Sequence, residues 1–183
     1  MKKTPIHVLM VSKALVVGAY HSKLEEMARL GIHLDVVIPR MWGGQKAERV
    51  QASGYTIHAL AVVFSGRNHF HFYHSLSALI KEIKPDIIHA DEESFSLITF
   101  LIIRRARALG IPVVFFNWQN IYKINPWPFS ALERFTMINA SAGIAGSKEV
   151  KEVLKKKDVP YRFMSSRSLV LTLVFFINIL KLN

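Results

Sequence analysis

The hydrophobic positions along the chain alternate between short β-branched runs and longer stretches in which apolar residues recur with the period of a helix. The short runs predict strands at 7–12, 34–38, 55–60 (a region continued by 61–64), 87–90, 113–117 and 143–145. The periodic stretches predict helices at 22–30, 73–83, 94–109, 129–139 and 147–157. Near-continuous apolar strands separated by helices are typical of a parallel sheet covered on both faces, so the pattern predicts a doubly wound α/β fold.

Single residues mark several helix ends. Ser22 followed by Glu25 has the spacing of a capping box and predicts the start of the first helix, which ends at Gly31. Gly110 ends the third helix, and Ser147 caps the last one.

Composition and charge narrow the class of protein. With 183 residues, 51% of them hydrophobic, the chain is long enough for one domain with its own core and is not a disordered tail. It has no cysteine, which excludes a disulfide scaffold, a thiolate zinc site and a cysteine nucleophile. The net charge of +11 suits phosphate-bearing ligands, anionic lipid or nucleic acid. The N-terminus leads directly into the first strand, so we expect no signal peptide.

In doubly wound folds ligands bind outside the carboxyl ends of the strands, which directs attention to the loops that follow them. The first such loop, 13–20, contains Gly18 but neither G-x-G-x-x-G nor a Walker lysine-serine pair, which argues against a dinucleotide dehydrogenase or a P-loop enzyme. A glycine before a helix lets backbone N–H groups approach a phosphate, and it equally suits a plain tight turn. The residues leave both interpretations open.

Three acidic residues, Asp91, Glu92 and Glu93, directly follow a strand at this edge. Asp91 and Glu92 are candidates for binding sugar hydroxyls or for acting as a base, whereas for Glu93 we favour stabilisation of the dipole of the following helix. His89 lies inside the apolar strand before them, and we expect it to be a packed core histidine.

Histidines and aromatic residues alternate in the segment 69–74 (HFHFYH). In an extended chain the alternation turns His69 and His71 to one side and Phe70 and Phe72 to the other. A metal site needs convergent ligands, so we favour an aromatic loop that packs on the domain or touches an apolar acceptor, and we expect no metal site.

The most unusual stretch is 118–123 (WQNIYK), followed by 126–129 (PWPF). Aromatic faces beside amide and ammonium groups suit carbohydrate, because sugar rings stack on aromatics and their hydroxyls need polar partners. On composition alone we slightly favour the alternative, a proline-stiffened loop whose aromatics cover the sheet edge.

Several segments together resemble the N-terminal domain of glycosyltransferase family 4 enzymes of the GT-B fold. The segments are 13–20 (KALVVGAY), 23–26 (KLEE), 84–89 (KPDIIH), 118–120 (WQN), 126–129 (PWPF), 133–135 (ERF) and 145–147 (AGS). The resemblance covers about residues 6–158. It implies a Rossmann-like half of an enzyme that moves a sugar from a nucleotide-sugar donor to a saccharide or lipid-linked acceptor, with retention of configuration, in cell-surface polysaccharide assembly. It also implies that the chain binds no metal or other cofactor of its own.

The resemblance assigns roles to residues of two of the loops. The loop around Gly18, flanked by Lys13 and Tyr20, would face the donor phosphates. Asp91 and Glu92 would bind acceptor hydroxyls.

Many family members have a histidine after the strand that ends here at Asn117. This chain has Trp118 and Gln119 instead, and Gln119 is the candidate catalytic residue, in contact with the transferred sugar. The other predicted substrate-binding residues are Trp118, Asn120, Lys123, Ser147, Lys148 and Glu149.

The resemblance also implies a second Rossmann-like domain, which holds most of the nucleotide-sugar site and a paired-glutamate motif. We therefore expect 1–158 to form the N-terminal domain, the truncated chain to be inactive alone, and 159–183 to be a non-native or disordered tail. The apolar run of this tail is shorter than the roughly 20 residues that a membrane span needs. With suitable codons for 164–176, an alternative frame spells VIPQFGVDPGFF, which resembles the start of the second domain. We therefore hypothesise a frameshift near 158–163, which the nucleotide sequence tests.

A function of another class stays open: a non-catalytic α/β module that binds a membrane surface or a protein partner through its basic residues and apolar tail. We do not expect nucleic-acid binding, because the basic residues are scattered and the short cluster 155–157 suits a helix C-terminus. In either case we expect a cytoplasmic protein with a peripheral contact at the inner face of the membrane.

Overall fold

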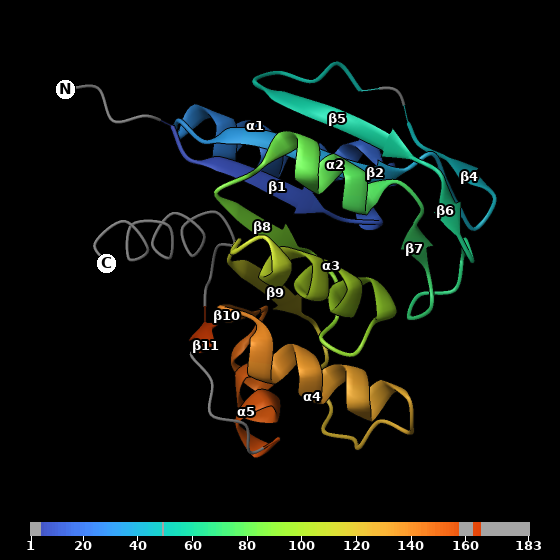
Figure 1. Cartoon of the computed structure of the whole chain (residues 1–183), viewed down its shortest axis with the longest axis vertical. Helices are drawn as coiled ribbons and strands as arrows, with labels where there is room; N and C mark the ends of the chain where they lie inside the picture. Colours follow the sequence, from blue (N-terminus) through green and yellow to red (C-terminus); the bar gives the residue numbers. More distant parts are fainter. Residues whose placement is uncertain (1–4, 49, 158–162, 166–183) are drawn as a thin grey trace.

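The computed structural model describes residues 5–48, 50–157 and 163–165. They form a parallel sheet of seven strands in the order β11-β10-β9-β8-β1-β2-β5 (Figure 1). The strands are β1 (His7–Val11), β2 (His33–Pro39), β5 (Tyr55–Leu60), β8 (Ile87–Ala90), β9 (Val113–Asn117), β10 (Ala142–Ala145) and β11 (Phe163–Ser165). The chain winds from β1 through β2 to β5 and then returns to the other side of β1 at β8, which confirms the doubly wound α/β fold.

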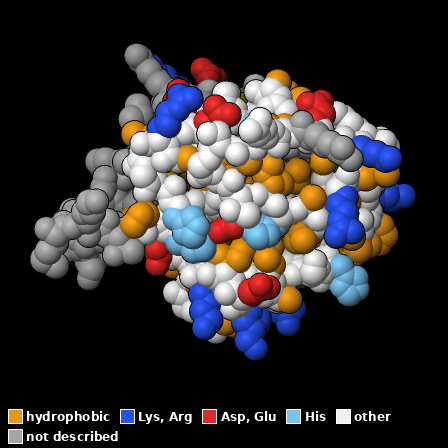
Figure 2. Space-filling model, turned by 90° about the horizontal axis from the view of Figure 1, so that it is seen from above, with side chains coloured by type: hydrophobic (Ala, Val, Ile, Leu, Met, Phe, Trp, Pro, Cys, Tyr) orange, Lys and Arg blue, Asp and Glu red, His pale blue; other side chains and the backbone are white. Residues whose placement is uncertain are grey.

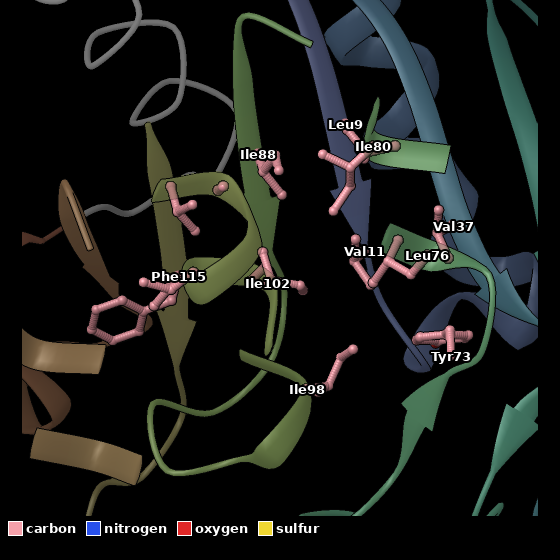
Figure 3. Close-up of a cluster of buried hydrophobic side chains, with 14 of the residues drawn as sticks. Leu9, Val11, Val37, Tyr73, Leu76, Ile80, Ile88, Ile98, Ile102 and Phe115 are labelled. Carbon is pink, nitrogen blue, oxygen red and sulfur yellow. The ribbon is translucent and has the colours of Figure 1, made fainter. Parts of the chain in front are cut away.

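Helices cover both faces of the sheet, but unequally. They are α1 (Ser22–Arg29), α2 (Leu76–Ile83), α3 (Leu97–Ala108), α4 (Phe129–Asn139) and α5 (Lys148–Lys156). On one face Leu24 and Met27 of α1 pack against Val8 and Met10 of β1. On the other face α2, α3, α4 and α5 bury apolar side chains against the sheet, and Figure 3 shows part of this second cluster. The second face therefore carries most of the helical cover.

Several elements begin and end where the sequence predicts. The strands β8 and β9 and the helix α4 have the predicted bounds. Gly31 and Gly110 follow α1 and α3 with φ of +80° and +69°, a backbone conformation that residues with a side chain rarely adopt. These glycines let the chain turn directly out of each helix into the next strand.

The predicted loop after β1 contains two short 3₁₀ helices, η1 (Ala14–Val16) and η2 (Gly18–His21). Because η2 leads directly into α1, Ser22 lies inside the helix and His21 occupies the capping position. The predicted capping box at Ser22 is therefore wrong.

The helices α2 and α3 begin later than predicted. Tyr73 belongs to β7 (Phe72–Tyr73), which pairs antiparallel with β6 (Val62–Val63), so α2 begins only at Leu76. The helix α3 begins at Leu97, three residues after the expected start. A second small hairpin, β3 (Met41–Trp42) with β4 (Gln45–Lys46), occupies the predicted loop after β2.

The chain beyond α5 was predicted to be a tail foreign to the fold. Three of its residues, Phe163–Ser165, form β11 and pair in parallel with β10. The rest of 159–183, including most of the segment used for the frameshift argument, lies outside the described residues, and the domain boundary and the frameshift stay predictions. Among the helices that the structure describes, none has the length and hydropathy to cross a membrane.

Candidate functional site

The carboxyl edge of the sheet, where β1, β8 and β9 end, brings together polar side chains from distant parts of the chain. Asp91 follows β8, and its Oδ2 accepts hydrogen bonds from Ser12 Oγ and Lys23 Nζ, both at 2.8 Å. Burial alone would raise the pKa of Asp91, but the charge of Lys23 and these hydrogen bonds hold it below its usual range. Asp91 is thus an ionised group that ties α1 to the ends of β1 and β8.

Glu92 lies next to Asp91 and is buried. Lys13 makes two interactions with the Glu92 carboxylate. The Lys13 backbone N–H donates to Glu92 Oε1 at 3.0 Å, and the Lys13 ammonium group pairs with Glu92 Oε2. The buried His71 places its Nε2 3.6 Å from Glu92 Oε1. The predicted site residues Lys13 and Glu92, 79 positions apart in sequence, therefore meet as a pair whose carboxylate faces the protein.

The side chain of Glu93 turns toward the end of β9, where its Oε1 accepts a hydrogen bond from the Trp118 N–H at 3.1 Å. Its expected role at the helix dipole is wrong, because α3 begins four residues later at Leu97. Burial raises the pKa of Glu93 to about 7, although the Trp118 N–H and Lys13 act in the opposite direction. Its Oε2 is buried and has no hydrogen-bond partner in the part of the chain that the structure describes. Glu93 is therefore a carboxyl group that exchanges its proton near neutral pH.

Gly18 begins η2, and its N–H donates to Oε2 of Glu48 at 2.6 Å. A Cβ at position 18 would lie 2.8 Å from this oxygen and 2.9 Å from Cγ2 of Val50. A side chain at position 18 would therefore force Glu48 and Val50 to move, and the group that approaches the Gly18 backbone is a carboxylate of the same chain. Tyr20, in the same short helix, is exposed.

The segment after β9 presents its aromatic side chains to solvent. Trp118 is 65% exposed and Trp127 82% exposed. The Trp118 ring rests on Phe116, with 4.7 Å between the ring centroids. Asn120 and Lys123 are also exposed. The Trp118 ring thus covers part of the end of β9 while most of its surface stays open to solvent, and both interpretations of this segment stay open.

A buried polar network behind this segment holds it in place. Glu133 of α4 accepts hydrogen bonds from Ser94 Oγ (3.2 Å), Asn125 Nδ2 (3.1 Å) and Lys157 Nζ (2.5 Å). Lys157 also donates to Oε1 of the predicted catalytic candidate Gln119, at 3.1 Å. The amide of Gln119 is thus engaged inside the protein, whereas the indole of Trp118 faces outward.

A cavity of about 480 Å³ lies between the segment 122–125 and α4. Its lining is formed by Tyr122, Lys123, Ile124, Asn125, Ser130, Glu133, Arg134, Met137, Ile138 and Lys157. Of the predicted site residues only Lys123 lines it, but it shares Lys157 and Glu133 with the network that holds Gln119. The sequence does not predict this cavity, because its walls come from a loop, a helix and the end of α5, which are distant in sequence.

The loop after β10 places its residues beside the end of β9. Ser147 caps α5 as predicted, since its Oγ accepts from Val150 N–H at 3.3 Å. The Gly146 N–H donates to Asn117 O at 3.2 Å, which brings this loop to the end of β9. Lys148 and Glu149 are exposed, and a hydrogen bond from the Ser147 side chain lowers the pKa of Glu149.

The histidines considered for metal binding are packed side chains. His89 is fully buried, as expected, and burial lowers its pKa to about 4. The His69 ring packs against Phe95, with 4.7 Å between centroids. Among the described residues the group with the geometry to hold a metal ion is His7, His33 and Asp35, at the amino edge of the sheet. The pattern along the chain does not reveal this group, because its members lie on two strands.

Comparison with known families and structures agrees with this architecture. The family model described as Glycosyltransferase Family 4 matches residues 21–162. None of the curated proteins compared with the chain matches it by sequence.

Among solved structures, a UDP-N-acetylglucosamine 2-epimerase is 17% identical with a TM-score of 0.56, over 84% of this chain and 45% of that one. The UDP-GlcNAc 2-epimerase from Neisseria meningitidis, solved with UDP-GlcNAc, is 15% identical with a TM-score of 0.52, over 91% and 46%. A sucrose-phosphate synthase structure from Thermosynechococcus elongatus is 12% identical with a TM-score of 0.63, over 96% of both chains. The chain thus spans less than half the length of the two epimerases. At this identity the likeness shows the fold.

Proposed function

Since the chain belongs to glycosyltransferase family 4, we propose that it forms the acceptor-side half of a retaining glycosyltransferase. The family uses nucleotide-sugar donors, and the fold is that of the N-terminal half of GT-B enzymes. The proposed reaction moves a sugar from such a donor to a saccharide or lipid-linked acceptor in cell-surface polysaccharide assembly. The proposed location is the cytoplasmic face of the membrane.

One observation carries this proposal: the indole of Trp118 is exposed at the carboxyl edge while the backbone beneath it is held in place. The Trp118 N–H is bound by Glu93, and the next side chain, Gln119, is bound by Lys157. A flat aromatic face on a fixed support stacks on a sugar ring with little loss of side-chain freedom. Asn120 and Lys123 then supply polar partners for hydroxyl groups.

The other predicted residues take supporting roles in this proposal. The Gly18 N–H would bind a donor phosphate after displacement of the Glu48 carboxylate, which accepts its hydrogen bond, and the exposed Tyr20 lies in the same short helix. Lys13 flanks the loop proposed to face the donor phosphates and forms an ion pair with Glu92. Acceptor hydroxyls are the proposed ligands of Asp91 and Glu92, and Glu92 would have to leave its ion pair with Lys13 to reach them. Ser147, Lys148 and Glu149 would lie near the face toward the second, donor-binding domain.

We also propose that the chain alone does not transfer sugar. Stabilising a leaving nucleotide diphosphate needs positive or hydrogen-bonding groups aimed at its oxygens. In the proposed arrangement these groups belong mainly to the second domain, as do most contacts that choose the donor sugar. Binding of saccharide, by contrast, should be measurable on the chain itself.

The first prediction concerns this binding. We expect ¹⁵N-labelled chain titrated with gluco-, galacto- and N-acetylhexosamine oligosaccharides to shift the indole signal of Trp118, and Trp118→Ala to weaken binding about tenfold through loss of stacking. Phe64→Ala, which removes an exposed aromatic ring of the hairpin between β6 and β7, is the matched control and should leave affinity unchanged. Equal loss in both variants, or shifts spread over the whole chain, would contradict the proposed site.

A second candidate function rests on a different observation, the apolar tip of the same segment. Ile124 is 81% exposed, and Ile121 and Trp127 are exposed to a similar extent. Lys123 is also exposed and lies between Ile121 and Ile124 in the sequence. Exposed apolar side chains next to a cation are typical of protein surfaces that insert into the headgroup region of a membrane. A non-catalytic module acting at a membrane surface would use this tip.

The second prediction separates the two functions. We expect the chain to sediment with phosphatidylcholine vesicles containing one third phosphatidylglycerol, and the double variant Ile124→Ser with Trp127→Ser to lose most of this binding. High salt should remove only the part due to charge. Leu30→Ser, at the exposed end of α1, serves as the control and should bind like the parent. Vesicle binding without any saccharide binding would favour the membrane module, and the absence of vesicle binding would exclude it.

A further inference from the structure

Imidazole and carboxylate side chains collect at the amino edge of the sheet, opposite the proposed sugar site. His7 of β1 and His33 of β2 are neighbours in the parallel register, and Asp35 lies two residues further along β2 on the same face of the sheet. His58 of β5 pairs with Val37 and therefore points to this face as well. Three strands thus contribute to one cluster.

The geometry of three of these residues is that of a metal-binding group. The ligand atoms of His7, His33 and Asp35 all lie within 4.8 Å of one another. Asp35 Oδ2 is 2.5 Å from His7 Nε2 and 4.0 Å from His33 Nε2, and the two imidazole rings stack with centroids 4.0 Å apart. Nitrogen and oxygen ligands around a tetrahedral zinc ion are about 3.3 Å apart, a separation that lies between these two distances.

His58 completes the arrangement from the third strand. Its Nε2–H donates to the other oxygen of Asp35 at 2.5 Å. A hydrogen bond to the free oxygen of a ligating carboxylate is a common way in which proteins orient it toward the metal.

An ion has a route to this cluster. His33 is 58% exposed on its side chain, while His7 and Asp35 are largely buried beneath it. Figure 2, which looks onto the molecule from the side of β5, shows histidine side chains on both sides of a small acidic patch. One exposed and two sheltered ligands are compatible with capture of an ion at the surface.

We propose that His7, His33 and Asp35 bind a zinc-class divalent cation, with His58 orienting the carboxylate and water filling the remaining position. Two imidazoles and one carboxylate are ligands that suit Zn²⁺ and the other late first-row ions, and they are poor ligands for Ca²⁺ or Mg²⁺. The ion ties the amino ends of β1 and β2 together. The site is separate from the carboxyl edge and does not depend on the proposed sugar transfer.

The experiment is a calorimetric titration of the chelator-treated chain with Zn²⁺. A parallel titration uses Co²⁺ as a spectroscopic probe. We expect one ion per chain, the visible absorption of low-coordinate Co²⁺ bound to nitrogen and oxygen, and a Tm that rises by about 5 to 10 °C at a hundredfold excess of Zn²⁺ over its Kd. Mg²⁺ at the same concentration should leave the Tm unchanged.

His33→Ala is the informative variant, because the His33 side chain is exposed and its ring makes no hydrogen bond with any residue that the structure describes. It should fold with an unchanged metal-free Tm and lose at least tenfold in Zn²⁺ affinity, and Asp35→Asn should abolish binding. His74→Ala removes an exposed histidine outside the cluster and should bind like the parent. No stoichiometric Zn²⁺ binding, or equal affinity in the His33→Ala and His74→Ala variants, would overturn the proposal.

Discussion

Replacing Glu93 by Gln is expected to stabilise the chain at pH 8 by about 2 to 3 kcal/mol and to have little effect at pH 5. The pKa of Glu93 is raised from 4.5 to about 7, first of all by burial. Between these two values the unfolded chain releases the proton while the folded chain keeps it. Rising pH therefore favours the unfolded state over this interval, and above about pH 7 the penalty is constant. Glutamine keeps an oxygen for the Trp118 N–H but cannot ionise.

Denaturant unfolding at pH 5 and pH 8 measures this effect, and ¹³C NMR of the glutamate side chains follows the titration directly. Glu26→Gln, in an exposed position of α1, is the matched control and should change stability equally little at both pH values. If Glu93→Gln gave the same stability difference at pH 5 and pH 8, Glu93 would not carry the raised pKa described above.

Replacing Glu133 by Ala should lower the free energy of unfolding by about 3 to 5 kcal/mol, because it leaves the charge of Lys157 buried without its partner. The side chains of Lys157 and Glu133 are only 9% and 11% exposed. The variant also frees Asn125, so we expect faster amide exchange in the segment 118–128.

The double variant Glu133→Ala with Lys157→Ala tests this reason, since removing both charges should restore part of the lost stability. Glu152→Ala is the control for loss of an ion pair as such, because Glu152 and its partner Lys155 are both exposed and the pair should contribute nothing measurable. A double variant no more stable than Glu133→Ala alone would show that the buried charge is not the cause.

The sequence predicted the strands and helices that depend on local pattern. The strands β9 and β8 are buried on both faces and are therefore apolar except for Asn117 and His89, so both were found with their bounds. Gly31 and Gly110 marked helix ends because each needs a positive φ. These features depend on a residue and its near neighbours, which a single sequence displays.

The features that the sequence did not predict depend on contacts between distant residues. Glu93 was assigned to a helix dipole, whereas its partner is the Trp118 N–H, 25 residues away. Tyr73 was assigned to a helix because its pairing with Val62 is not visible in the local period. His7, His33 and Asp35 converge only because β1 and β2 are neighbours in register. A pattern along the chain does not report which residues the sheet brings side by side.

The Glu48 carboxylate competes with external anions for the Gly18 N–H, because it already accepts a hydrogen bond from this group. Any anion that reaches the Gly18 N–H must first displace the Glu48 carboxylate, which is tethered 30 residues away and present at a high effective concentration. We expect a monoanion such as acetate to compete poorly with the tethered carboxylate, and a ligand with several charges and further contacts to compete well. In the proposed function, a phosphate-bearing donor would therefore need more than one charge to bind at this loop.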